Sequence, residues 1–196
     1  MKSHKDKLFL PAGGKPLIYH SLMTFNDHPD IESIMIVVNK NNKSEIENIV
    51  KKFHFPKVKK IVIGGLTRQQ SFLKGFQALP KNLQKDDIIL SHNADNPLVS
   101  HEEISAAIQR TEVGGAAIVG HCPASTIKET DHPEGNMEKK IVKTHDRASL
   151  FSAETPQAAK LHIFKKALAN AAKKKLEVTD EAMLLEAIKQ RVVCIE

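Results

Sequence analysis

Cysteine and the large aromatic residues are scarce in this chain. Its 196 residues include two cysteines, Cys122 and Cys194, one tyrosine and no tryptophan. Two cysteines exclude a disulfide framework or a cysteine-based zinc site, and they suit a reducing, cytoplasmic setting. No apolar run reaches the roughly 18 residues that a membrane-spanning helix needs. The polar residues 1–7 have no apolar stretch behind them, so we expect neither a membrane partner nor a signal peptide.

Positive charge exceeds negative charge, with a formal net charge of +6. An excess of this kind attracts anionic substrates such as nucleotides and sugar phosphates. The lysines are spread along the chain without interleaved aromatic residues, so we rank a basic RNA-binding protein last and expect no nucleic-acid partner. The length fits one domain with its own core, and we treat residues 1–196 as a single domain.

Runs rich in β-forming residues alternate with helical stretches. Strands are predicted at 31–38, 58–63, 87–92 and 115–120, and helices at 43–53, 67–79 and 102–111. Two more helices are predicted at 161–174 and 179–189, before a last strand at 191–195. This alternation predicts an α/β fold: a doubly wound, Rossmann-like, mostly parallel sheet with right-handed crossovers.

Residues 123–150 interrupt that alternation. Two β-like runs, 125–130 and 139–144, flank the turn-rich stretch 131–136, which predicts a protruding β-hairpin arm. An arm with so little apolar sequence has no core of its own. We therefore expect it to pack on something else, such as another subunit.

Chemistry in such a sheet belongs at the carboxyl ends of the strands, which points to Gly64–Ser71, His92–Pro97 and the stretch after Gly120. In Gly64–Ser71, two glycines let a ligand approach the backbone, a helix N-terminus offers free N–H groups, and Arg68 and Ser71 add donors. An ordinary strand-to-helix turn remains an equal alternative for this segment.

The segment His92–Pro97 is rich in side chains that bind polar ligands. Asn93, Asp95 and Asn96 suit ribose hydroxyls, phosphates or a hydrated Mg²⁺, although the same composition is common in plain turns. No histidine spacing indicates a protein-held metal site.

Four basic residues far apart in the sequence are candidates for binding phosphates. Phosphoryl and nucleotidyl transfer need cations around the reacting phosphorus to hold the charge on its oxygens. For any one of these residues, a solvated surface charge is the alternative. The candidates are Lys7, Lys15, Lys128 and Arg147.

Six short motifs, in this order, resemble the 2-C-methyl-D-erythritol 4-phosphate cytidylyltransferase family, over nearly the whole chain. Each is short, but their shared order is specific. They are K-L-F-L-P-A-G-G-K-P-L at 7–17, G-G-L-T-R-Q-Q-S at 64–71, T-I-K at 126–128, T-H-D-R at 144–147, E-T-P-Q-A at 154–158 and T-D-E-A at 179–182.

The resemblance implies a nucleotide-diphospho-sugar-transferase type of fold and a cytidylyltransferase. The substrate phosphate attacks the α-phosphorus of CTP, pyrophosphate leaves, and Mg²⁺ bridges the triphosphate. Family homodimers form through the arm. The implied roles are catalysis for Lys7 and Arg147, nucleotide binding for Gly64, Gly65, Arg68, Ser71 and Asn93, and substrate binding for Thr126, Lys128 and Asp95.

The sequence departs from the family pattern in three places. The family's glycine-rich loop has no match, and we interpret Met1 as that loop's last methionine; the strand before the loop is central in the family's sheet, so we expect unpaired strand edges. Asn93 and Asn96 stand where the family has aspartate and arginine in H-D-A-A-R-P. The family's C-terminal K-I-T segment also has no match.

Two alternatives stay open beside the methylerythritol phosphate enzyme. A ribitol 5-phosphate cytidylyltransferase shares the scaffold and differs in the polyol. A degenerate, non-catalytic relative would fit the missing phosphate-loop glycines. The intact residues favour an enzyme: Lys7, Arg68, Ser71, Thr126 and Arg147.

Overall fold

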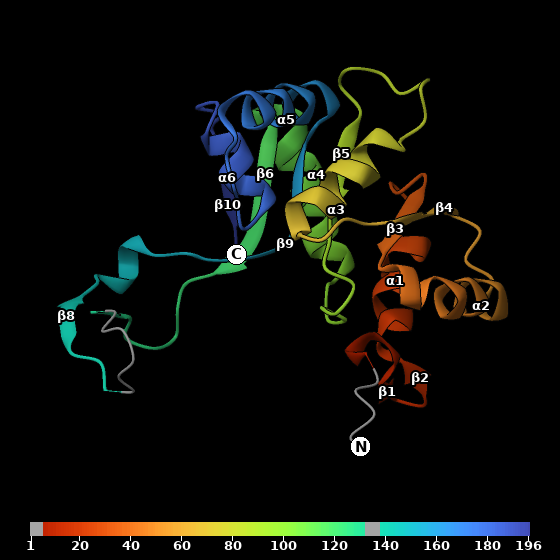
Figure 1. The fold of residues 1–196 in the computed structure, drawn as a ribbon, viewed down its shortest axis with the longest axis horizontal. Helices are drawn as coiled ribbons and strands as arrows, with labels where there is room; N and C mark the ends of the chain where they lie inside the picture. The colour runs from red at the N-terminus through yellow and green to blue at the C-terminus, as the bar shows by residue number, and fades with distance from the viewer. Residues whose placement is uncertain (1–5, 132–137) are drawn as a thin grey trace.

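The computed structural model describes residues 6–131 and 138–196 (Figure 1). The interpretation of Met1 and most of the predicted 131–136 turn lie outside these residues. The first half contains η1 (Lys7–Phe9), β1 (Pro11–Ala12), β2 (Lys15–Pro16), α1 (Leu17–Asp27), β3 (Ile34–Val38), η2 (Lys40–Asn42), α2 (Lys43–Phe53), β4 (Val58–Ile63), α3 (Arg68–Gln77) and β5 (Ile88–Ser91). The second half contains α4 (His101–Gly114), β6 (Ala116–His121), β7 (Lys128–Thr130), β8 (Ile141–Thr144), η3 (Arg147–Ser149), β9 (Ser152–Lys160), α5 (Leu161–Lys174), α6 (Glu181–Glu186) and β10 (Val193–Ile195).

The main sheet has the strand order β10-β6-β9-β5. Strand β10 runs parallel to β6, and β9 runs antiparallel to both β6 and β5. Three of these four strands therefore share one direction. Helices cover both faces of this sheet, so the predicted doubly wound α/β architecture is confirmed.

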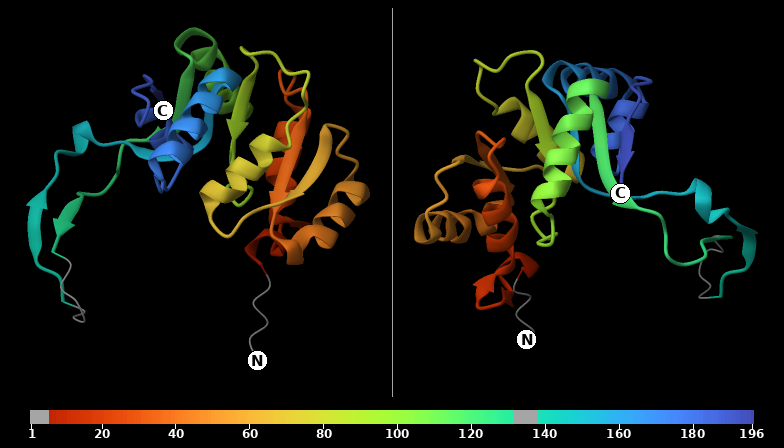
Figure 2. Two further views of the ribbon diagram at one scale, coloured as in Figure 1. Left: turned by 45° about the horizontal axis from the view of Figure 1, so that its top comes forward. Right: turned by 180° about the vertical axis from the view of Figure 1, so that it is seen from behind.

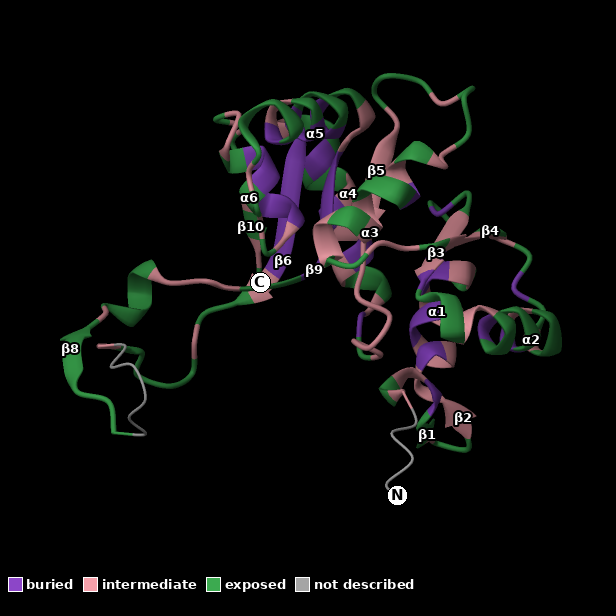
Figure 3. Cartoon of the chain, in the orientation of Figure 1, coloured by how far each residue is buried: buried purple, intermediate pink, exposed green. Residues whose placement is uncertain are grey.

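Neighbouring residues of the sheet send side chains to opposite faces, as strand geometry requires. Ala159 packs in a cluster with residues of α3, α5 and α6, whereas Ala158 packs against Ala107 of α4. Small alanine side chains let these helices lie close to the strands. The buried residues concentrate in this region (Figure 3).

A second, two-stranded parallel sheet is formed by β3 and β4. Helices α1 and α2 cover it, and Ile18, Ile36 and Ile46 share its core. Ile34 of β3 and Leu90 of β5 lie in one further cluster, so the two sheets adjoin (Figure 2). Within residues 6–131 and 138–196, β3 and β5 each pair along one edge alone, in agreement with the expected unpaired edges.

Strand β9 was not predicted as a strand, because Pro156 lies in its middle. Proline lacks an N–H for the ladder and is rare in central strands. Here Pro156 falls where the β6–β9 register shifts, and it is one residue beyond the Ser91–Gln157 pair of β5 and β9. The missing N–H of Pro156 therefore removes no hydrogen bond from a paired position of the sheet.

Helix α6 is shorter than the predicted 179–189. Asp180 caps it by accepting a hydrogen bond from the backbone N–H of Met183, so the helix begins at Glu181. The helix ends at Glu186. Helix α1, which follows Pro16, was not predicted. In the described stretches, no helix is long and apolar enough to cross a membrane.

The described residues of the arm, 123–131 and 138–150, extend away from the body of the molecule in every view (Figures 1 and 2). Its strands β7 and β8 pair antiparallel, as predicted for the hairpin. Ile141 and Val142 of β8 are each 63% exposed, so apolar side chains of the arm face solvent in the single chain.

Candidate active site

The turn between β4 and α3 is built around two glycines. Ser71 Oγ accepts a hydrogen bond from the Gly65 N–H at 3.1 Å and donates one to the Thr67 carbonyl at 2.9 Å. A Cβ on Gly64 would lie 2.6 Å from Ser71 Oγ, and one on Gly65 would collide with Gln70. The turn therefore needs glycine at both positions to bring the backbone against α3.

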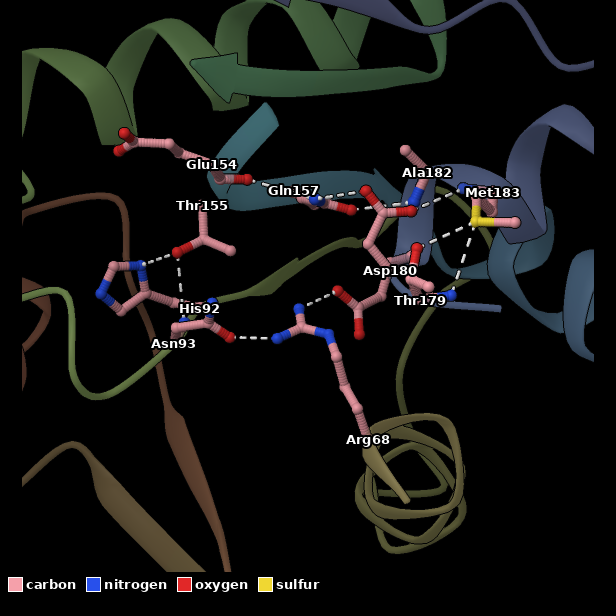
Figure 4. A network of polar contacts seen from close by, with 11 residues as sticks. Arg68, His92, Asn93, Glu154, Thr155, Gln157, Thr179, Asp180, Ala182 and Met183 are labelled. Carbon is pink, nitrogen blue, oxygen red and sulfur yellow. Dashed lines mark hydrogen bonds and ion pairs between the residues drawn. The ribbon is translucent and has the colours of Figure 1, made fainter. Parts of the chain in front are cut away.

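Arg68, the first residue of α3, joins this turn to the end of β5. Its guanidinium donates to Asn93 Oδ1 through Nη1 and contacts Glu181 Oε2 at 2.6 Å through Nη2 (Figure 4). The two segments expected at the carboxyl ends of strands, Gly64–Ser71 and His92–Pro97, are thus joined by one side chain.

His92 orders the backbone at the end of β5. Its Nε2 donates to the Asn96 carbonyl at 3.0 Å, which leaves Nδ1 to accept from Thr155 Oγ1 at 3.0 Å. The Thr155 hydroxyl accepts in turn from the Asn93 N–H at 3.2 Å. Burial lowers the pKa of His92 to about 4, so the ring is neutral at pH 7 and this chain of hydrogen bonds holds Asn93 in place.

Lys7 and Asp95 form an ion pair beside that turn. The hydrogen bond from Lys7 and its positive charge lower the pKa of Asp95, and the same contact raises the pKa of Lys7. The Lys7 side chain is 68% exposed and that of Asp95 is 30% exposed. A solvent-accessible cation is therefore fixed at the end of β5.

Other predicted phosphate-binding residues lie elsewhere. Lys15 Nζ lies 4.7 Å from the ring centre of Phe53, so it packs on an aromatic ring. Lys128 donates to Thr144 at 2.7 Å and Arg147 to the Ala124 carbonyl at 2.8 Å, both within the arm. The expected convergence of these residues with Lys7 is not found within one chain, because the arm extends away from the body (Figure 1).

Three residues of this network were not singled out from the sequence: Thr155, Gln157 and Glu181. They are 4%, 3% and 3% exposed. Their motifs, E-T-P-Q-A and T-D-E-A, were noticed for their resemblance to the family. A polar residue in an apolar stretch, such as Gln157 before Ala158 and Ala159, was the available signal, since buried polar groups need partners.

The fold and this site define a class of protein. A doubly wound α/β sheet with a glycine turn and a cation at neighbouring strand ends is an arrangement that binds nucleotides and their phosphates. A solved structure from Anaerococcus prevotii, a 4-diphosphocytidyl-2C-methyl-D-erythritol synthase, has the same fold, with a TM-score of 0.81 and 22% identity over 94% of this chain and 78% of that one.

Comparison with known proteins identifies the family. The family model described as "IspD: 2-C-methyl-D-erythritol 4-phosphate cytidylyltransferase" matches residues 1–196. The enzyme of that name from Clostridium acetobutylicum is 37% identical over 190 residues, which are 95% of this chain and 78% of that protein. The one from Bacillus velezensis is 32% identical over 188 residues, covering 96% and 77%. The chain belongs to this family, whose members are cytidylyltransferases and hence nucleotidyltransferases.

Proposed function

We propose that this protein transfers CMP from CTP to 2-C-methyl-D-erythritol 4-phosphate and releases pyrophosphate, a step that supplies isoprenoid precursors. An oxygen of the substrate phosphate forms the new bond to the α-phosphorus, and the bond from that phosphorus to the β-phosphate oxygen breaks. Family membership supports the reaction. The observation that carries the proposal is the placement of Lys7, Arg68 and Asn93 around two neighbouring strand ends.

In this proposal Lys7 stabilises the α-phosphate. Negative charge grows on its oxygens during transfer, and a fixed cation lowers the barrier most where charge develops. Lys7 reaches the end of β5 and is accessible to solvent. A phosphate oxygen can replace the Asp95 carboxylate as its partner. Asp95 itself is proposed to contact the second substrate.

The nucleotide is proposed to bind at the glycine turn. Gly64 and Gly65 allow backbone groups to approach cytosine and ribose, and Ser71 lies beside them with its hydroxyl bonded to the turn. Arg68 and Asn93 line the neighbouring strand end.

Magnesium is proposed to arrive with the triphosphate. No group of three or more carboxylate, histidine or cysteine ligands occurs in the described part of the chain, but nucleotide-bound Mg²⁺ needs only one or two carboxylates besides the phosphates and water. Most of its ligands would therefore come from the phosphates and water. The ion, when bound, would neutralise charge on the phosphates.

The second substrate and a second subunit are proposed to meet at the arm. Thr126, Lys128 and Arg147 supply hydroxyl, ammonium and guanidinium groups suited to a polyol phosphate. All three lie on the arm, which extends away from the body in the single chain, so a partner's body would have to complete the site. We therefore propose a homodimer formed through residues 123–150 of a single 1–196 domain. The two exposed free thiols suit a cytoplasmic enzyme.

Calorimetric titration of CTP with Mg²⁺, followed by a pyrophosphate-release assay with 2-C-methyl-D-erythritol 4-phosphate, tests this function. We expect CTP binding, turnover, and a loss of kcat of at least about 100-fold in Lys7→Ala, the size typical of removing a charge-stabilising group. Lys43→Ala, which removes an exposed lysine paired with Glu47 on α2, is the matched control and should keep full activity.

Ribitol 5-phosphate should be a poor substrate in the same assay. Faster turnover of ribitol 5-phosphate would assign the enzyme to that polyol instead. CTP binding without turnover of either substrate, or no CTP binding, would indicate a non-catalytic relative.

A further inference from the structure

Glu181 lies at the first position of α6, far in sequence from the proposed nucleotide residues. We propose that Glu181 is a positioning residue of the nucleotide site: it anchors Arg68, and Arg68 orients the Asn93 amide so that its NH₂ group can donate to the nucleotide. This inference rests on the proposed function, since it names how that site is held and which hydrogen bond it offers.

The anchoring contact is an ion pair whose carboxylate is buried and whose guanidinium is partly exposed. Glu181 Oε2 lies 2.6 Å from Arg68 Nη2, and the Glu181 side chain is 3% exposed while that of Arg68 is 36% exposed (Figure 4). A buried carboxylate is costly without a charged partner. The pair therefore ties the start of α6 to the start of α3, across 113 positions of sequence.

Glu181 is itself held rigidly. Asp180 caps the helix at the Met183 N–H, and the Ala182 N–H donates to Gln157 Oε1 at 2.8 Å. Gln157 Nε2 in turn reaches Asp180 Oδ2 at 3.2 Å. The carboxylate of Glu181 thus projects from a helix start that is hydrogen-bonded to β9.

The other side of the Arg68 guanidinium sets the orientation of Asn93. Arginine can only donate, so the Asn93 amide must present its oxygen to Arg68. The Asn93 backbone N–H is bound to Thr155. Across residues 6–131 and 138–196, no group accepts a hydrogen bond from Asn93 Nδ2, which leaves two N–H donors for an acceptor such as a ribose hydroxyl or phosphate oxygen.

The orientation of Arg68 and Asn93 depends on the negative charge of Glu181. Asn93 is neutral, and within the described residues Glu181 is the one carboxylate in ion-pair contact with Arg68. Loss of that charge would leave the guanidinium free to turn toward solvent, and the Asn93 amide would lose the contact that fixes its orientation.

Glu181→Gln tests the link, since it keeps the shape and removes the charge. We expect the Kd for CTP with Mg²⁺, measured by calorimetry, to rise about tenfold, which corresponds to ~1.4 kcal/mol, and the Tm to fall. Adding Asn93→Asp returns a carboxylate to Arg68. The double variant should regain Tm but not CTP affinity, because aspartate has no NH₂ to donate.

Glu186→Gln serves as the control, because it makes the same chemical change at an exposed position at the end of α6. It should leave the Kd for CTP within about twofold, a shift of under ~0.5 kcal/mol.

An unchanged Kd in Glu181→Gln, or an equal rise in Glu186→Gln, would overturn the positioning role. Recovery of CTP affinity in the double variant would overturn the donor role of Asn93. If the unmodified protein does not bind CTP, the proposed function fails instead. The anchoring link is then judged by Tm alone, and it is overturned if Asn93→Asp does not restore the Tm of Glu181→Gln.

Discussion

At the scale of single residues, His92 makes stability depend on pH. Its pKa is lowered to about 4 by burial, whereas an unfolded histidine titrates near pH 6.5. Between these values the unfolded chain binds a proton that the folded chain does not. The free energy of unfolding therefore falls as pH drops from about 6.5 to about 4, by at most ~3.4 kcal/mol. We expect His92→Gln to remove this part of the pH dependence in urea unfolding measured at pH 7.5 and 5. An equal loss of stability in both proteins would contradict this expectation.

At the scale of elements, the β4–α3 turn should tolerate no side chain at Gly64. An added Cβ would push Ser71 Oγ away and break its hydrogen bonds to Gly65 and Thr67. We expect Gly64→Ala to weaken CTP binding at least tenfold, or ~1.4 kcal/mol, in the calorimetric titration. Gly114→Ala is the control, because its Cβ would meet only Val193 at 3.4 Å and alanine favours the α4 helix. Equal losses in both variants would refute a specific role of the turn.

At the scale of the whole molecule, the exposed arm should hold two chains together. Ile141 and Val142 lie on β8 at 63% exposure each, and apolar patches of this kind mark interaction sites. We expect a dimer in sedimentation equilibrium, and Ile141→Asp with Val142→Asp should give a monomer that has lost turnover. Val113→Asp changes a residue of α4 that is 92% exposed and does not belong to the arm, and it should remain dimeric. A monomeric unmodified protein with full activity would refute the shared site.

The sequence by itself determined the class of fold, most element positions and the family. Helices α2 and α5 and strand β4 have the predicted bounds, because their apolar spacing and end signals are local and agree with each other. The glycine turn and the run after β5 were expected at the carboxyl ends of strands, and Arg68 joins them through Asn93. The family assignment from six ordered motifs is confirmed.

Only the tertiary structure decided which side chains meet. Strand β9 was not predicted, and whether Pro156 disrupts a strand there depends on the register of the neighbouring strands. The Arg68–Glu181 and Lys7–Asp95 pairs join positions far apart in sequence, and no local pattern encodes such a distance. The extension of the arm away from the body likewise depends on the path of the whole chain. Local periodicity specifies elements, whereas partner choice among charged groups depends on how those elements pack.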